Sequence, residues 1–171
     1  MNICVFCSAN DVAPQYVAAA EKLGRWLGRE GHTLVYGGAN LGLMEAVARA
    51  AHEAGATVVG VVPAILEKTG RASDHIDVRV LCDSLDDRKA IMVERSDLFV
   101  ALPGGVGTLD EIFTVVAAAS IGYHHKRVVL LNIDGFWDSL LAMLDDLQSK
   151  GVLRPSLKET LTVVTEVEKV V

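Results

Sequence analysis

Short apolar runs alternate along the whole chain with longer segments in which apolar residues recur at helical spacing. Runs of apolar, β-branched residues predict strands, and a recurrence every three or four positions predicts helices. The predicted strands span residues 3–7, 33–36, 57–62, 78–81, 98–102, 128–132 and 161–164. The predicted helices span residues 14–30, 43–54, 108–121 and 136–150, with a further helix beginning at Ser84.

The strand runs are apolar at successive positions, so both faces of each strand are predicted to be buried. Strands of this kind that alternate with helices indicate a doubly wound, Rossmann-like α/β fold, in which helices cover both faces of a parallel sheet. Residues 1–171 are predicted to form a single nucleotide-binding domain of this class. Residues 67–77 form the only polar, glycine-containing stretch long enough to be a mobile loop.

Composition and charge narrow the classes of partner. The 171 residues include 16 Lys and Arg against 22 Asp and Glu, a net charge of −6. This balance argues against a nucleic-acid polymer or an anionic membrane surface, which clustered basic residues bind. No apolar run is long enough to span a bilayer, and no signal peptide is readable at the start. We expect a soluble, cytoplasmic protein.

Three cysteines are too few for a disulfide framework, and their placement favours the core. Cys4 and Cys7 have the spacing of a redox pair but lie in a predicted strand, where an odd offset points the two sulfur atoms to opposite faces. No second cysteine pair completes a zinc site, and the histidines lack ligand-like spacing. The sequence therefore predicts no metal requirement.

Two glycine-rich junctions join a predicted strand to a predicted helix, at residues 36–44 and 102–111. Both fall at the carboxyl edge of the sheet, where ligands bind in doubly wound folds. Successive backbone N–H groups at such a junction can converge on an anion. Thr108 is expected to cap the second helix and to offer a hydroxyl group to the same anion. A purely geometric role for the glycines is the alternative for each junction.

The details of the two junctions exclude two familiar nucleotide motifs. Leu43-Met44 stands where a P-loop requires Lys followed by Ser or Thr. Asp110 stands where the dinucleotide fingerprint has its third glycine, which argues against NAD. The two glycine loops together favour a phosphate site of a mononucleotide kind.

Charged residues lie in the first turns of two predicted helices near this site. Arg88 and Lys89 lie in the first turns of the helix that begins at Ser84, and Glu111 lies in the first turn of the helix that begins at Thr108. The helix dipole and a nearby arginine are expected to lower the pKa of Glu111 and hold it ionised. A solvated helix face for the cations and an ordinary first-turn acid for Glu111 remain the alternatives from spacing alone.

The stretch Pro103-Gly104-Gly105-Val106-Gly107-Thr108-Leu109-Asp110-Glu111 resembles the PGGxGTxxE signature of the LONELY GUY (LOG) family of cytokinin riboside 5′-monophosphate phosphoribohydrolases. Tyr36-Gly37-Gly38 and Arg88-Lys89-x-x-Met92 extend the resemblance in the same order and spacing. It implies hydrolysis of the N-glycosidic bond of a nucleoside 5′-monophosphate to free base and ribose 5-phosphate, without a cofactor. Members are often labelled lysine decarboxylases, but no motif here suggests a pyridoxal phosphate Schiff base.

The resemblance also implies roles for individual residues. It assigns catalysis to Arg88 and Glu111. It also implies a second set of residues, which bind the phosphate or the rest of the substrate: Ser8, Gly38, Met44, Lys89, Gly104, Gly105, Gly107 and Thr108. A glycosidic cleavage develops oxocarbenium character on the sugar, which an ionised carboxylate stabilises, and the same carboxylate can deprotonate the attacking water.

Several positions depart from the family pattern, namely Ser8-Ala9-Asn10, Ala39, Glu45, Leu85-Asp86, Ala117-Ala118 and Ser120. They are expected to alter the walls of the pocket and leave the identity of the base open. The main alternative is a non-catalytic binder of a nucleotide or of a molybdenum cofactor. A weaker alternative is a nicotinamide-dependent oxidoreductase.

The predicted helix over residues 108–121 is apolar on more than the single stripe that covers a sheet. An additional apolar face is most simply buried against a second subunit, and the LOG family is similar in forming homodimers at this region. The sequence therefore predicts a homodimer.

Overall fold

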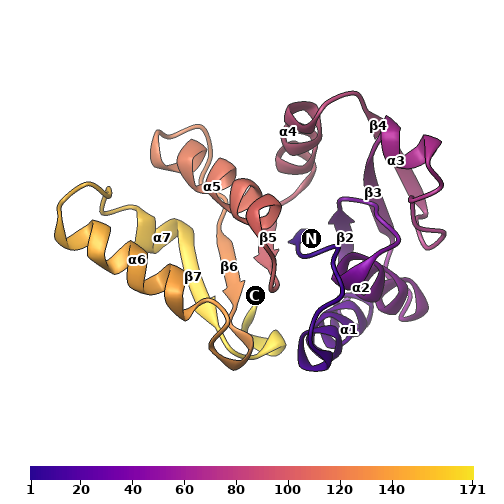
Figure 1. Cartoon of the computed structure of the whole chain (residues 1–171), viewed down its shortest axis with the longest axis horizontal. Helices are drawn as coiled ribbons and strands as arrows, with labels where there is room; N and C mark the ends of the chain where they lie inside the picture. The colour runs from indigo at the N-terminus through magenta and orange to yellow at the C-terminus, as the bar shows by residue number, and fades with distance from the viewer.

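The computed structural model describes residues 1–171 as one seven-stranded sheet in which every neighbouring pair of strands is parallel, in the order β4-β3-β2-β1-β5-β6-β7. The strands are β1 Asn2–Phe6, β2 Thr33–Tyr36, β3 Val58–Pro63, β4 Val78–Cys82, β5 Leu98–Ala101, β6 Val128–Leu131 and β7 Leu161–Val164. All seven predicted strands are present, and the doubly wound fold with helices on both faces is confirmed (Figure 1).

Helices cover both faces of the sheet and connect its strands. They are α1 Pro14–Arg29, α2 Gly42–Glu53, α3 Ala64–Lys68, α4 Leu85–Arg95, α5 Val106–Ser120, α6 Asp138–Ser149 and α7 Leu157–Thr160, with 3₁₀ turns at Ile133–Gly135 and Val167–Lys169. Helices α1 and α2 bury one face of the sheet, and α4, α5 and α6 bury the other. No helix is both long and apolar enough to cross a membrane.

Strand β1 lies between β2 and β5 and is buried on both faces. Ile3 and Val5 pack into the cluster under α1 and α2, whereas Cys4 and Phe6 pack into the cluster under α4 and α5. Cys7 lies on the side of Ile3, opposite Cys4. The interpretation of Cys4 and Cys7 as core residues on opposite faces is therefore confirmed.

Helix α5 begins at Val106, two residues before its predicted start. Gly105 is the N-cap residue and no side chain caps the helix, so the prediction that Thr108 caps it is wrong. At the other junction, Ser84 does cap α4, because its hydroxyl group accepts a hydrogen bond from the Asp87 N–H at 3.1 Å.

The segment predicted as a mobile loop is held on several sides. Residues 67 and 68 belong to α3, and a bridge pairs Ala72 with Ala39. The buried Ser73 donates its N–H to the Gly38 carbonyl at 2.9 Å, and the Asp77 carboxylate accepts the Val58 N–H at 2.8 Å. These contacts fix the segment against the ends of β2 and β3.

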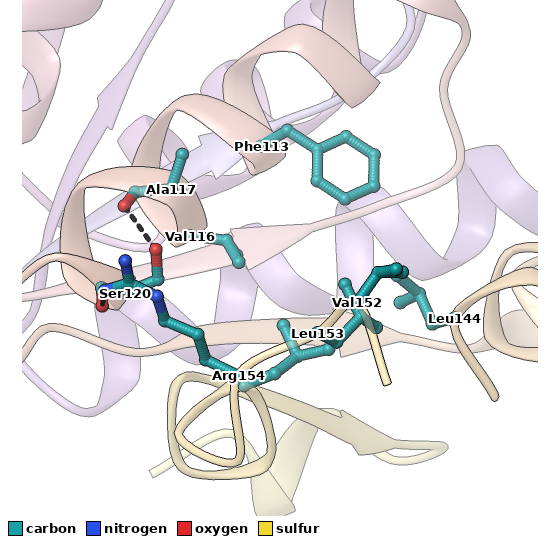
Figure 2. A pocket seen from close by; sticks show the side chains of 9 residues that line it. Phe113, Val116, Ala117, Ser120, Leu144, Val152, Leu153 and Arg154 are labelled. Atoms are coloured by element: carbon teal, nitrogen blue, oxygen red, sulfur yellow. Dashed lines mark hydrogen bonds between the residues drawn. The ribbon is translucent and has the colours of Figure 1, made fainter. Parts of the chain in front are cut away.

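Within its own chain, helix α5 packs against α6 and α7 as well as against the sheet. Ile112 and Val115 face the sheet, whereas Phe113 lies toward α6 and α7. Between these helices lies an apolar cavity of about 250 Å³, which Phe113, Leu144 and Leu157 help to line (Figure 2). Helices α6 and α7 therefore account for part of the additional apolar face of α5, which the sequence pattern alone had predicted to be buried against a second subunit.

Helices α1 and α2 approach closely at two glycines, Gly24 and Gly28. A Cβ atom at Gly24 would lie 2.5 Å from the Val47 carbonyl oxygen and 2.8 Å from the Ala51 nitrogen. These are backbone atoms, so relief requires the two helices to separate.

We expect Gly24→Ala to destabilise the fold by about 1–3 kcal/mol through overpacking, although alanine is the better helix former. Urea unfolding followed by circular dichroism measures the change. The exposed Ala18 on the same helix supplies the calibration, because Ala18→Gly should cost about 1 kcal/mol by helix propensity alone. A stability of Gly24→Ala equal to or above that of the wild type would contradict the close-packing interpretation.

Candidate active site

The candidate site lies where the loops after β1 and β5 diverge, at the point of the sheet where the direction of winding reverses. A cavity of about 220 Å³ opens there. Its lining residues are Cys7, Ser8, Ala9, Asn10, Met44, Arg88, Gly105, Val106, Gly107, Thr108 and Glu111. They come from the loops after β1 and β5 and from the first two turns of α2, α4 and α5.

The structure brings most of the predicted site residues together. Those that line the cavity are Ser8, Met44, Arg88, Gly105, Gly107, Thr108 and Glu111. Gly38, Lys89 and Gly104 do not line it. Lys89 and Gly104 each adjoin a lining residue in the chain, whereas a Cβ atom at Gly38 would meet Val62 and Ile76, which do not line the cavity.

Ser8 joins the two halves of the site through its backbone. Its N–H donates to the Pro103 carbonyl at 3.1 Å, and its carbonyl accepts the Leu43 N–H at 2.9 Å. Its hydroxyl group accepts the Asn10 N–H at 3.0 Å, which closes the turn after β1. Ser8 thus holds the loop before α5 and the start of α2 at a fixed separation.

Gly104 makes room for a site residue. A Cβ atom at Gly104 would lie 2.0 Å from the hydroxyl oxygen of Thr108, which is itself almost fully buried. Thr108 is in the first turn of α5, where backbone N–H groups have no intrahelical acceptor. Gly105 and Gly107 line the cavity and would accept a Cβ without contacts, so they leave this helix terminus open to a ligand.

Arg88 enters the cavity from the first turn of α4 and is fixed by backbone carbonyl groups. Its Nη2 atom donates to the Gly37 carbonyl at 2.6 Å, and its Nε atom donates to the Val61 carbonyl at 3.3 Å. Gly37 was not among the predicted site residues. The signals for it in the sequence are its place in the Gly37-Gly38 pair and in the Tyr36-Gly37-Gly38 stretch that resembles the family.

Lys89 points away from the cavity and connects two helices. Its ammonium group lies 2.9 Å from the Asp110 carboxylate on α5 and 3.5 Å from that of Asp86 on α4. The hydrogen bond to Asp110 is the main cause that raises the pKa of Lys89. Lys89 thus fixes α4 beside α5, and so holds Arg88 near Glu111.

Glu111 is 8% exposed, and burial raises its pKa to about 7. The Arg88 charge opposes this shift and the Asp110 charge adds to it. The prediction that the pKa of Glu111 is lowered is therefore wrong. Desolvation of the carboxylate outweighs the attraction of Arg88, since no ion pair joins the two side chains and Arg88 bonds to carbonyl groups instead.

The rest of the cavity wall is apolar or neutral. Met44 contributes from α2, and Cys7 contributes a buried thiol whose pKa burial raises far above its ordinary value. Such a thiol is not a nucleophile near neutral pH. No group of three or more His, Cys, Asp or Glu side chains gathers in an arrangement that could hold a metal ion.

Of the departures from the family pattern, Ser8, Ala9 and Asn10 line the cavity. Glu45 bonds instead to the His75 ring at 2.8 Å, and Ala39 pairs with Ala72. Ala117 and Ser120 line the apolar cavity between α5 and α6 (Figure 2). The change in the site walls is thus concentrated in the turn after β1.

The raised pKa of Glu111 makes the free energy of unfolding depend on pH. Between pH 4.5 and about 7 the unfolded chain loses this proton while the folded chain keeps it, so stability falls as pH rises. We expect Glu111→Gln to be more stable than wild type by about 3 kcal/mol above pH 7, from 1.36 kcal/mol per pKa unit. Urea unfolding at pH 4.5 and pH 8 measures the difference, which should vanish at the lower pH. A difference independent of pH would contradict the raised pKa.

Known structures share this fold over nearly the full length of the chain. The molybdenum cofactor binding protein from the phototrophic bacterium Rippkaea orientalis aligns with a TM-score of 0.76 and 26% identity, over 98% of this chain and 90% of that one. The Moco carrier protein from Chlamydomonas reinhardtii aligns with a TM-score of 0.73 and 26% identity, over the same shares. Both similarities support the Rossmann-like fold.

Comparison of sequences identifies the family. The family model described as "Possible lysine decarboxylase" matches residues 44–171. Cytokinin riboside 5′-monophosphate phosphoribohydrolase LOG3 of Arabidopsis thaliana is 42% identical over 93% of this chain and 74% of its own length. The probable cytokinin riboside 5′-monophosphate phosphoribohydrolase LOGL5 of Oryza sativa is 44% identical over 93% of this chain. The chain spans 65% of the length of that relative. The chain therefore belongs to the LOG family of phosphoribohydrolase enzymes.

Proposed function

We propose that the protein hydrolyses the N-glycosidic bond of a nucleoside 5′-monophosphate and releases the free base and ribose 5-phosphate. The observation that carries this proposal is the buried carboxylate of Glu111 beside the Arg88 guanidinium, in a cavity that the open N-terminus of α5 faces. The names of the relatives favour a cytokinin nucleotide, which is an adenosine monophosphate with a substituted base.

The phosphate group of the substrate would lie at the first turn of α5. The free N–H groups there and the Thr108 hydroxyl group are donors, and the helix dipole favours an anion. Arg88 supplies the positive charge of the site and can orient the sugar phosphate through its remaining N–H groups. One guanidinium group and one helix terminus suffice for a single phosphate, even on a chain of net charge −6.

Glu111 would act in its ionised form. Cleavage of the glycosidic bond develops positive charge on the ribose ring, and a carboxylate that is shielded from water attracts such a charge more strongly than an exposed one. The same carboxylate can take the proton of the attacking water as the water adds to the anomeric carbon. The burial that raises the pKa of Glu111 is thus the condition for its electrostatic effect.

The residues that line this cavity do not fit the decarboxylase description of the family model. No lysine side chain lines it, and Lys89 is paired with Asp110 outside it. A chain of this kind has no amine at the site with which to form a Schiff base, so we interpret the site as hydrolytic.

A carrier of a molybdenum cofactor is the second candidate function. The names of the two solved structures and their 26% identity to this chain favour it. Calorimetry distinguishes the two functions: a carrier would bind a phosphate-containing cofactor tightly, turn over no nucleotide, and be insensitive to Glu111→Ala.

The catalytic proposal predicts base release from AMP or isopentenyladenosine monophosphate, measured by chromatography of the free base. Glu111→Gln should reduce kcat by about 100-fold or more, since the loss removes both charge stabilisation and the proton acceptor. In the wild type, kcat/KM should rise with pH through about 7, as Glu111 ionises.

A matched control is Glu94→Gln, which neutralises an exposed carboxylate on α4 and should leave the rate unchanged. Absence of base release from every nucleotide tested would contradict the function. A rate that falls with rising pH through about 7 would contradict the ionised role of Glu111 and identify it as the proton donor to the base.

We further propose that the protein is a homodimer in which the outer face at the end of α5 is buried. Ile121 is 59% exposed and Tyr123 is 81% exposed, next to the exposed Ala117. Large apolar side chains left exposed at the end of a helix favour a protein partner, and neither Ile121 nor Tyr123 lines the cavity between α5, α6 and α7.

Sedimentation at micromolar concentration should give twice the chain mass of 18.3 kDa for the wild type. Ile121→Glu should reduce it to the mass of a single chain, because a charge would have to be buried at the interface. Ile65→Glu, at a residue equally exposed on α3, is the control and should stay dimeric. A monomeric wild type would contradict the dimer.

A further inference from the structure

The Arg88 guanidinium is fixed by the ends of two neighbouring strands rather than by a carboxylate. The Gly37 carbonyl, directly after β2, accepts its Nη2 hydrogen at 2.6 Å, and the Val61 carbonyl in β3 accepts its Nε hydrogen at 3.3 Å. An arginine has five N–H donors in a rigid plane. Two of them are used by these carbonyl groups, and three remain for a ligand in the cavity.

The absence of a side chain at Gly37 is required by this arrangement. A Cβ atom there would lie 1.9 Å from Nη2 and 2.8 Å from Cζ of Arg88. The φ of Gly37 is not in the left-handed region, so a positive φ does not require glycine there. Gly38 differs, because its φ of +78° favours glycine in its own right. The space that Gly37 leaves empty is therefore the space that Arg88 occupies.

The peptide that follows the acceptor of the Arg88 hydrogen bond is also hydrogen-bonded. The next carbonyl along the chain, that of Gly38, accepts the N–H of the buried Ser73 at 2.9 Å. Two consecutive carbonyl groups are thus fixed, one by the site arginine and one by the segment after α3. A side chain at Gly37 would therefore press on a turn that is also hydrogen-bonded to Ser73.

We propose that Gly37 is a positioning residue that acts through Arg88: its carbonyl orients the guanidinium plane, and its lack of a Cβ atom admits that plane to the cavity. The proposal rests on the proposed function for its effect on rate. Orientation of a catalytic group is sensitive to displacements of about 1 Å, which can cost about 100-fold in rate.

The first experiment measures base release from AMP by Gly37→Ala. We expect kcat to fall by about 100-fold with a smaller change in KM, since the phosphate donors of α5 stay in place. The matched control is Gly60→Ala in β3, where the three atoms nearest to the Cβ position all belong to the Ile76 side chain and the closest is its terminal methyl carbon, at 2.5 Å. Its kcat should stay within a few-fold of the wild type. A folded Gly37→Ala protein with wild-type kcat would overturn the proposal.

The second experiment removes the Arg88 side chain and measures stability by urea unfolding. Gly37→Ala should lower the unfolding midpoint in the wild-type chain, or prevent folding altogether. It should lower the midpoint much less in the Arg88→Ala background, where the two nearest atoms are gone and the next is the flexible end of the Met44 side chain, at 3.3 Å from the Cβ position. Equal destabilisation in both backgrounds, or a double variant that fails to fold while Arg88→Ala folds, would show that the two residues are not coupled.

A third measurement does not depend on turnover, so it separates this inference from the proposed function. In a nitrogen-15 spectrum of the arginine side chains, an Nε–H group in a hydrogen bond exchanges slowly with water. For Arg88 this group donates to the Val61 carbonyl, so its signal reports whether the guanidinium plane keeps its place. We expect such a signal for Arg88 in the wild type and in Gly60→Ala, assigned by its loss in Arg88→Lys, and its loss in Gly37→Ala. An unchanged signal in Gly37→Ala would refute the positioning role even if the protein released no base.

Discussion

The constraint on which the rest of the structure depends is the burial of β1 on both faces between β2 and β5. A parallel strand in this position must send the chain to β2 on one side and receive β5 on the other. The loops after β1 and β5 therefore separate at its carboxyl end, where Ser8 bonds to Pro103 and to Leu43. The cavity follows from the topology, and the glycines keep it open.

Within that cavity, the partners of Arg88 explain the behaviour of Glu111. A guanidinium group in an ion pair would lower the pKa of the carboxylate, but two N–H groups of Arg88 bond to the carbonyls of Gly37 and Val61. The attraction that remains is weaker than the cost of desolvation, and the pKa of Glu111 rises to about 7. Because the backbone holds the cation in place, the site keeps opposite charges close without a direct bond between them.

The sequence was sufficient to predict the seven strands, because a strand buried on both faces leaves a continuous apolar run. It also predicted seven of the residues that line the cavity, through the glycine loops and the family signature. It placed the start of α5 too late, since Val106 is 84% exposed and adds nothing to the helical period. It gave the wrong direction for the pKa of Glu111 because a residue's burial depends on packing that spacing does not contain. Gly37 was missed because its partner lies 51 positions away in the chain.

The apolar excess of α5 has a consequence for the site. Ile112 and Val115 fix this helix on the sheet, Phe113 packs toward α6 and α7, and the Lys89–Asp110 pair holds it against α4. Contacts on three sides restrain rotation of the helix about its axis, so Glu111, one residue before Ile112, is held toward the cavity. A carboxylate that was free to turn would move toward water and regain its ordinary pKa. The apolar residues along α5 thus keep the carboxylate in its desolvated position, and the composition of the helix is part of the electrostatics of the site.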